Sequence, residues 1–272
     1  MTKDVDEIQH PAVREALKFL NIQKGIEIHH QGDLPARSGL GSSSSFTVGL
    51  LHALHALDGR MVTKRRLMLD AIHIEQERLK ENVGSQDQAA AAFGGLNKIE
   101  FGGPHLIAVH PVLLTTKRME AFQSHLMMFF TGLTRTASDI AAEQIKSTAS
   151  NEHGSSLRIM RDMVEEAIEV VHKGAFEDFG RLLHEAWQIK KSLSAQISNS
   201  VIDEIYEAAR SAGAWGGKLL GAGAGGFMVF FVAPEKQKAV KERLHHLLNV
   251  PILFDHLGSQ VIYYAPEKNI QG

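Results

Sequence analysis

The sequence predicts an α+β protein, because helical and strand-like segments are mixed along its 272 residues without a regular strand–helix–strand alternation. Long segments with helical spacing follow residue 150, whereas short apolar runs typical of buried strands occur at 126–130 and 227–232. Two glycine-rich segments, 35–45 and 216–226, interrupt these elements. The composition changes near residue 120, so we expect two domains.

The first half of the chain shows four helical and three strand-like patterns. Pro11 fits the first turn of a helix, where its missing N–H is not needed, and Thr63 fits the cap of another. Asp58-Gly59 predicts a turn between helices. We expect helices over 11–20, from the Gly/Ser segment to 57, over 63–80 and over 89–94, and strands over 25–30, 96–101 and 105–112.

The second half is richer in helical patterns. The run Leu126-Met127-Met128-Phe129-Phe130 predicts a buried strand, as does Phe227–Val232. The remaining expected elements are helices over 136–149, 155–173, 175–195, 201–212 and 235–248, and a last strand over 259–264.

Composition restricts the classes of partner. The formal net charge is −2, so no general basic field favours nucleic acid or an anionic membrane. The chain has no cysteine, which excludes disulfides and thiolate metal sites. The polar N-terminus is unlike a signal peptide, and no apolar run is long enough for a bilayer. We therefore expect a cytoplasmic protein whose partners are small molecules. Composition leaves open whether the protein forms oligomers.

The segment Pro35-Ala36-Arg37-Ser38-Gly39-Leu40-Gly41-Ser42-Ser43-Ser44-Ser45 predicts a phosphate-binding loop. Glycine lets the backbone approach a ligand, and the first turn of the helix that follows has unpaired N–H groups and partial positive charge. A flexible linker is the alternative, but an apolar helical pattern begins immediately at Phe46. The Walker A sequence is absent here and in 216–226, so another type of phosphate loop is needed.

The segment 221–226 has the dinucleotide-binding spacing G-x-G-x-x-G. That fingerprint needs a helix after it, whereas the apolar strand Phe227–Val232 follows here. A nicotinamide-dependent oxidoreductase is therefore the weakest hypothesis. We favour a loop that faces a ligand over a simple tight turn.

Two carboxylates are candidates for phosphoryl-transfer chemistry. Asp87 lies between Gln86 and Gln88 in an expected polar loop, just before a run of small residues. Glu75 lies on the preceding helix, where Glu77 and Glu81 are equally available. Carboxylates hold Mg²⁺ and deprotonate or orient an acceptor hydroxyl, although each alone is more often a solvated surface residue.

Several motifs together resemble the GHMP kinases, the family of galactokinase, homoserine kinase, mevalonate kinase and phosphomevalonate kinase. Pro35-x-x-x-Gly39-Leu40-Gly41-Ser42-Ser43-Ser44 resembles their second signature, and Lys218-Leu219-Leu220-Gly221-Ala222-Gly223-Ala224-Gly225-Gly226 their third. Glu75 and Asp87 fall where the galactokinase branch has a magnesium ligand and a catalytic Asp. Gln86-Asp87-Gln88 and Thr131-Gly132-Leu133-Thr134-Arg135 resemble the subgroup that phosphorylates D-glycero-D-manno-heptose 7-phosphate.

The resemblance implies a two-domain fold: an incomplete ATP-binding domain over 1–118, similar to domain 2 of ribosomal protein S5, and a ferredoxin-like domain over 119–272. It also implies ATP and Mg²⁺ as cofactors and Asp87 as the catalytic residue, acting as a base or electrostatically. The implied ligand sets are Pro35, Ser38, Gly39, Leu40, Gly41, Ser42, Ser43 and Ser44 for ATP; Ser42 or Ser43 with Glu75 for Mg²⁺; and Gly221, Ala222, Gly223 and Arg135 for the acceptor.

The first signature of the family has no match in the 34 residues before Pro35, so the chain looks N-terminally shortened, with an incomplete acceptor site. The implied function is an ATP-dependent sugar kinase that phosphorylates the anomeric hydroxyl of D-glycero-D-manno-heptose 7-phosphate. The alternative is a non-catalytic relative that binds a nucleotide or a partner.

Overall fold

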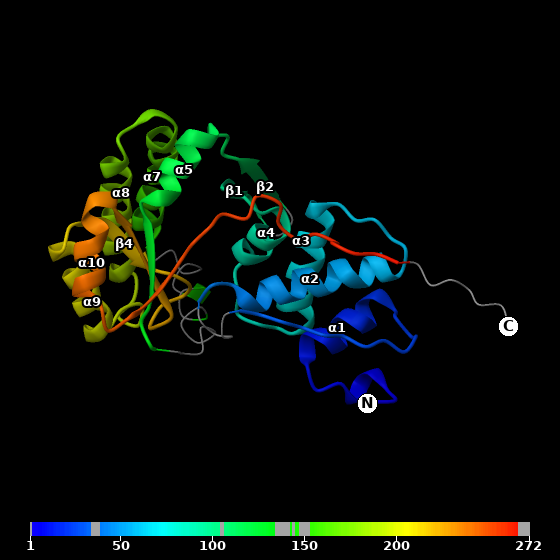
Figure 1. Ribbon diagram of the computed structural model, residues 1–272. Helices are drawn as coiled ribbons and strands as arrows, with labels where there is room; N and C mark the ends of the chain where they lie inside the picture. Colours follow the sequence, from blue (N-terminus) through cyan, green and yellow to red (C-terminus); the bar gives the residue numbers. More distant parts are fainter. Residues whose placement is uncertain are drawn as a thin grey trace. The chain divides into compact units, whose positions relative to one another are not determined.

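A computed structural model describes residues 2–33, 39–103, 106–133, 142, 145–146 and 153–265 (Figure 1). The chain forms two compact units. Unit 1 comprises 1–35, 41–111 and 255–272, and unit 2 comprises 36–40 and 112–254. The sequence places a single boundary at 118/119, whereas the chain returns to unit 1 at its C-terminal end. No helix within the described ranges is both long and apolar enough to cross a membrane.

Unit 1 contains helices and a two-stranded antiparallel sheet. In chain order it has the short 3₁₀ turn η1 (Val5–Glu7), α1 (Pro11–Leu20), α2 (Ser42–Leu57), α3 (Lys64–Ile72), the π-helical turn η2 (His73–Arg78), α4 (Gln86–Phe93), β1 (Asn97–Phe101) and β2 (Ile107–Pro111). The Thr63 hydroxyl accepts a hydrogen bond from the Arg66 amide, which confirms the predicted cap of α3. Buried apolar side chains of α1, α2, α3 and α4 form one core, which includes Leu17, Val48, Leu51, Leu67 and Met68.

The C-terminal segment of unit 1 crosses α4. The amide of Gly95 donates to Asp255 O, the amide of Ser259 donates to Ala91 O, and Lys64 Nζ donates to Leu257 O at 2.7 Å. A Cβ on Gly94 would lie 2.1 Å from the Gly258 nitrogen. The two backbones therefore touch at a point where only glycine fits, and this contact fixes the end of α4.

Unit 2 is built on a four-stranded antiparallel sheet in the order β4-β5-β3-β6. Its elements are α5 (Thr116–Ser124), β3 (Leu126–Phe130), α7 (Gly154–Lys173), α8 (Phe176–Ser192), α9 (Ser200–Ser211), β4 (Ala214–Leu219), β5 (Phe227–Val232), the 3₁₀ turn η3 (Pro234–Lys236), α10 (Gln237–Arg243) and β6 (Leu248–Val250). The connection from β3 to β4 is helical, and β5 lies between those two strands. This is the split strand–helix–strand arrangement of a ferredoxin-like fold, as predicted.

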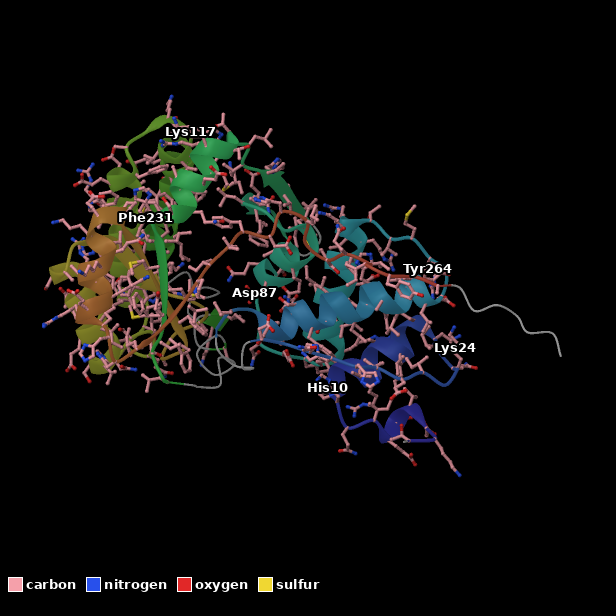
Figure 2. The ribbon with its side chains drawn as sticks, viewed as in Figure 1. His10, Lys24, Asp87, Lys117, Phe231 and Tyr264 are labelled. Atoms are coloured by element: carbon pink, nitrogen blue, oxygen red, sulfur yellow. The ribbon has the colours of Figure 1, made fainter. Side chains whose placement is uncertain are left out.

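Apolar side chains that alternate along the central strands divide into two packed sets. Phe230 and Met228 of β5 contact the core that contains Trp187 of α8 and Ile202 and Tyr206 of α9. Phe231, labelled in Figure 2, lies among the rings of Phe122, Phe176, Phe179 and Trp215 instead. Side chains on both faces of β5 thus pack helices against the sheet, and Phe231 contacts both Phe179 of α8 and Trp215 of β4.

Several predicted elements are wrong or displaced. Residues 25–30 and 259–264 form no strand and pair with no described strand, because alternation of side chains does not supply a neighbouring strand. The predicted helix 235–248 ends as α10 at Arg243. β4 and β6 were not predicted as strands. The predicted helix 136–149 falls almost wholly outside the described residues.

Candidate functional site

The predicted phosphate loop leads directly into α2. Gly41 precedes the helix with φ +68°, a conformation that favours glycine, and its carbonyl accepts from the Ser45 amide at 2.9 Å. The amides of Ser42, Ser43 and Ser44 donate to no described residue, as expected for the first turn of a helix. The start of α2 therefore presents unpaired N–H groups and the positive end of the helix dipole.

Glu75 lies in the π-helical turn η2 and is almost completely buried, with 1% of its surface exposed. The other two candidates, Glu77 and Glu81, are exposed, so the structure separates Glu75 from residues that the sequence left equivalent. Ser44 Oγ of α2 donates to Glu75 Oε2 at 2.9 Å, and Gln88 Nε2 of α4 donates to the same oxygen. Three elements of unit 1 thus meet at one carboxylate.

The other oxygen of this carboxylate, Glu75 Oε1, is buried and has no hydrogen-bond partner in the described part of the chain. Burial raises the pKa of Glu75, and the hydrogen bonds from Ser44 and Gln88 only partly oppose this. A buried carboxylate oxygen without a donor beside serine hydroxyls fits a hard cation such as Mg²⁺. Within the described residues, no group of three or more His, Cys, Asp or Glu side chains could hold a metal ion. Mg²⁺ commonly takes hydroxyl, water and phosphate oxygens as further ligands.

Asp87 lies in the first turn of α4, not in a loop as predicted, because that helix already begins at Gln86. Its carboxyl carbon lies 2.9 Å from where a Cβ on Gly41 would be, so its side chain lies against the start of α2; Figure 2 labels it there. Burial raises the pKa of Asp87, against the opposing effect of a weak hydrogen bond from Gln86. Because Gly41 has no side chain, the carboxyl can approach the phosphate loop this closely.

In unit 2, the second glycine-rich segment is the loop between β4 and β5. Its backbone touches the residues that precede α2: a Cβ on Gly221 would lie 2.9 Å from Gly39 Cα, and a Cβ on Gly39 would lie 3.0 Å from Leu220 O. Gly223 packs equally closely on Ile197. The amides of Gly221 and Gly223 donate to no described residue. This loop is therefore tightly fixed while it keeps free N–H groups.

The end of β3 holds the other side of this loop. Thr131 Oγ1 donates to Gly226 O at 2.8 Å, and the Gly226 amide donates to Leu133 O at 2.8 Å. Two antiparallel strands flank the loop, so it lacks the strand–turn–helix context of a dinucleotide site. The G-x-G-x-x-G spacing consequently gives no support to a nicotinamide-dependent enzyme.

The structure brings together some of the predicted site residues and adds others. Gly41, Ser44, Glu75 and Asp87 are neighbours through the contacts above, whereas Pro35, Ser38 and Arg135 lie outside the described residues. Ser44, predicted only as a phosphate ligand, makes the hydroxyl contact with Glu75; Ser42 is partly buried, and Ser43 is exposed. Sequence reasoning missed the contact of Gln88 with Glu75, although it noted Gln88 beside Asp87.

Two family models match the chain. The model described as GHMP kinases N terminal domain matches residues 9–95, and the one described as GHMP kinases C terminal matches residues 163–249. The first match covers the phosphate loop, Glu75 and Asp87, and the second covers the loop between β4 and β5.

Proteins that are similar to this chain in sequence or in structure include named kinases. The chain is 35% identical over 213 residues to a D-glycero-alpha-D-manno-heptose 7-phosphate kinase of Campylobacter jejuni, covering 77% of this chain and 62% of that protein. It is 30% identical over 251 residues to a Bacteroides fragilis L-fucokinase/L-fucose-1-P guanylyltransferase, covering 90% of this chain and 26% of that protein. The crystal structure of a D-glycero-D-manno-heptose 1-phosphate kinase from Bacteroides thetaiotaomicron is similar with a TM-score of 0.69 and 26% identity, covering 95% of this chain and 77% of that one.

Proposed function

Because the chain belongs to the GHMP kinase family, we propose that it transfers the γ-phosphoryl group of ATP to a hydroxyl group of a sugar. The observation that carries the proposal is the cluster at the start of α2, where free amides, a buried carboxylate with an unpartnered oxygen and a second carboxyl lie together. Phosphoryl transfer depends mainly on positioning and on charge neutralisation, and these groups supply both. In this assignment residues 1–118 form the ATP-binding domain and 119–272 the C-terminal domain.

The segment 35–44 binds the phosphates of ATP in this proposal. The amides of Ser42, Ser43 and Ser44 donate to phosphate oxygens at the positive end of α2, and Gly39, Leu40 and Gly41 let the backbone approach. Pro35 and Ser38 belong to the same predicted set.

Glu75, with the hydroxyl of Ser42 or Ser43, is proposed to hold Mg²⁺ through its unpartnered oxygen Oε1. Mg²⁺ held there would neutralise charge on the phosphates. Ser44 and Gln88 do not need to touch the ion: both donate to Oε2, which fixes the carboxylate and leaves Oε1 as the oxygen for the cation. Burial raises the pKa of Glu75, and a cation bound at Oε1 would favour the ionised form of this carboxyl.

Asp87 is proposed to accept the proton of the acceptor hydroxyl or to stabilise its developing charge. A carboxyl whose pKa is raised by burial is a stronger base once ionised. The close contact with Gly41 holds this carboxyl at the phosphate loop. The groups that orient the reacting hydroxyl and the γ-phosphoryl group would then both lie at the N-terminal end of α2.

The proposed acceptor is D-glycero-D-manno-heptose 7-phosphate, phosphorylated at its anomeric hydroxyl. The support is the 35% identical C. jejuni kinase, which bears that substrate in its name. Gly221, Ala222 and Gly223, together with Arg135, are proposed to contact this acceptor. Relatives named for other acceptors, such as a galactokinase of Pyrococcus furiosus at 24% identity, are more distant.

A coupled assay of ADP release tests this proposal. We expect turnover with Mg²⁺, ATP and the heptose 7-phosphate, and much weaker turnover with galactose, L-fucose or mevalonate. The Asp87→Ala variant provides the background. Turnover of another acceptor in preference to the heptose would correct the substrate, whereas Mg·ATP binding with no transfer above background would favour a non-catalytic relative.

A further inference from the structure

Two lysines of unit 2 converge on the loop between β4 and β5. Lys190 extends from α8, and its Nζ donates to Gly221 O at 2.8 Å. Lys218 lies on β4, three residues before that glycine, and its charge acts on Lys190. Both side chains are partly buried. The Lys190 ammonium therefore lies at the loop, where the charge of Lys218 acts on it. The Gly221 and Gly223 amides of this loop have no acceptor in the described part of the chain.

No carboxylate of the described residues pairs with either lysine. The neighbouring Lys191 differs, because its Nζ lies 2.9 Å from Asp203 Oδ1. Burial, and then the charge of Lys218, lower the pKa of Lys190 to about 8, and burial lowers the pKa of Lys218. Buried like charges without a counter-ion are unfavourable in the free protein, so an anion that enters this site would relieve the repulsion.

We propose that Lys190 and Lys218 form a phosphate-binding site, with the Gly221 and Gly223 amides as further donors. The ligand class is a phosphate ester that carries two negative charges. In the free protein Lys190 uses one of its three donors on Gly221 O, which leaves two for phosphate oxygens. Tight packing of Gly221 on Gly39 and of Gly223 on Ile197 fixes the loop, so the donors are positioned before the anion arrives.

Two sources could supply this phosphate: the 7-phosphate of the acceptor, which rests on the proposed function, or a phosphate of the nucleotide. The chemistry at the lysines is the same for both. Binding measurements with separate ligands distinguish the sources, and inorganic phosphate tests the site without reference to either.

The experiment uses the full chain and compares Lys218→Met and Lys190→Met with Lys191→Met by isothermal titration calorimetry. Lys191→Met is the matched control, because it removes a lysine of the same helix that already has an acidic partner. The probes are inorganic phosphate, heptose 7-phosphate, heptose without the phosphate, and Mg²⁺ with a non-hydrolysable ATP analogue. Loss of one charged donor is expected to weaken binding of a phosphate about 10–100-fold.

We expect Lys218→Met to weaken binding of inorganic phosphate and heptose 7-phosphate, and Lys191→Met to change neither. If the ATP analogue is weakened instead of the heptose phosphate, the site belongs to the nucleotide. Unchanged affinity of both Lys218→Met and Lys190→Met for all phosphorylated probes would overturn the inference. Failure of the wild type to bind the heptose phosphate would reject only the proposed acceptor, because inorganic phosphate still tests the lysines. Circular dichroism and a melting curve check that each variant is folded. If Lys218→Met does not fold, Lys190→Met tests the site.

Discussion

The carboxyl carbon of Asp87 lies 2.9 Å from the position that a Cβ would take on Gly41. One residue thus begins α2 in a left-handed conformation, and the other occupies the space in which its side chain would lie. The contact joins the phosphate loop to the proposed catalytic carboxyl within unit 1. Gly41 is therefore needed for two separate reasons, and they can be tested separately.

Gly41→Ala is expected to reduce kcat/KM strongly, while the free energy of unfolding falls only moderately. The new methyl group must displace the Asp87 carboxyl, in addition to the cost of a positive φ, which is about 1–2 kcal/mol. Gly59→Ala is the matched control, since Gly59 has φ +66° and open space around it. Both variants should lose similar stability in chemical denaturation, and only Gly41→Ala should lose activity. Equal activity of the two variants would contradict the proposed role of the contact.

Asp87→Asn is expected to lower kcat about 10²–10⁴-fold, because the amide cannot accept the proton of the acceptor hydroxyl. Burial raises the pKa of Asp87, so wild-type activity should rise with pH through a value above 3.8 as the carboxyl ionises. This acidic limb should be absent from the pH profile of the residual activity of Asp87→Asn. Asp162→Asn, at an exposed position of α7, controls for loss of a charge. A variant that keeps a third of wild-type kcat would exclude Asp87 as the base.

Local patterns predicted the elements of this chain better than its pairings. Pro11 and the apolar spacing predicted α1 with its observed bounds, and Thr63 caps α3 as expected. Residues 25–30 alternate like a strand, yet alternation says nothing about whether a neighbour is present. β4 escaped prediction because Gly216 and Gly217 have low strand propensity. They are needed because a Cβ on Gly216 would lie 2.0 Å from Gly180 O of α8.

The candidate site was predictable in its residue types but not in its detailed contacts. Glycines, serines and two carboxylates indicated phosphate chemistry before any coordinates. Which serine faces Glu75 depends on where α2 begins, since side chains repeat every three to four residues along a helix. The helix begins at Ser42, and this register places Ser44 and Thr47 at Glu75. Lys190 carried no signal, because a lysine on an amphipathic helix is indistinguishable from its neighbour Lys191 until the fold is known.

Gly94→Ala is expected to destabilise unit 1 by about 2–4 kcal/mol, because overpacking adds to a positive φ. The new Cβ would lie 2.1 Å from the Gly258 nitrogen and would displace the C-terminal segment from α4. Gly84→Ala, at an exposed position with open space, should change stability by less than about 0.5 kcal/mol. Urea denaturation followed by circular dichroism measures both. Equal midpoints would show that the segment does not pack on α4 as described.

Glu75→Gln is expected to raise the Mg²⁺ concentration required for half-maximal activity about 10–100-fold, since a charged ligand is replaced by a neutral one. Glu77→Gln provides the control: it removes the same charge two residues away, at an exposed position. The measurement is the rate of ADP release as a function of Mg²⁺ at saturating ATP. The same Mg²⁺ dependence in both variants would show that Glu75 is not a ligand of the metal.

In the ligand-free protein, the stability of Glu75→Gln relative to the wild type should increase as pH rises. Burial raises the pKa of Glu75 above its ordinary 4.5, so between these two values the folded state binds more protons than the unfolded state. Wild-type stability must therefore fall as pH rises through this window, whereas Glu75→Gln has no such proton to lose. The advantage of Glu75→Gln should grow from pH 4.5 upward and become constant above the raised pKa. Urea melts at a series of pH values without Mg²⁺ measure the difference. Adding Mg²⁺ with an ATP analogue should reduce it, because the wild type binds the cation more tightly than Glu75→Gln does.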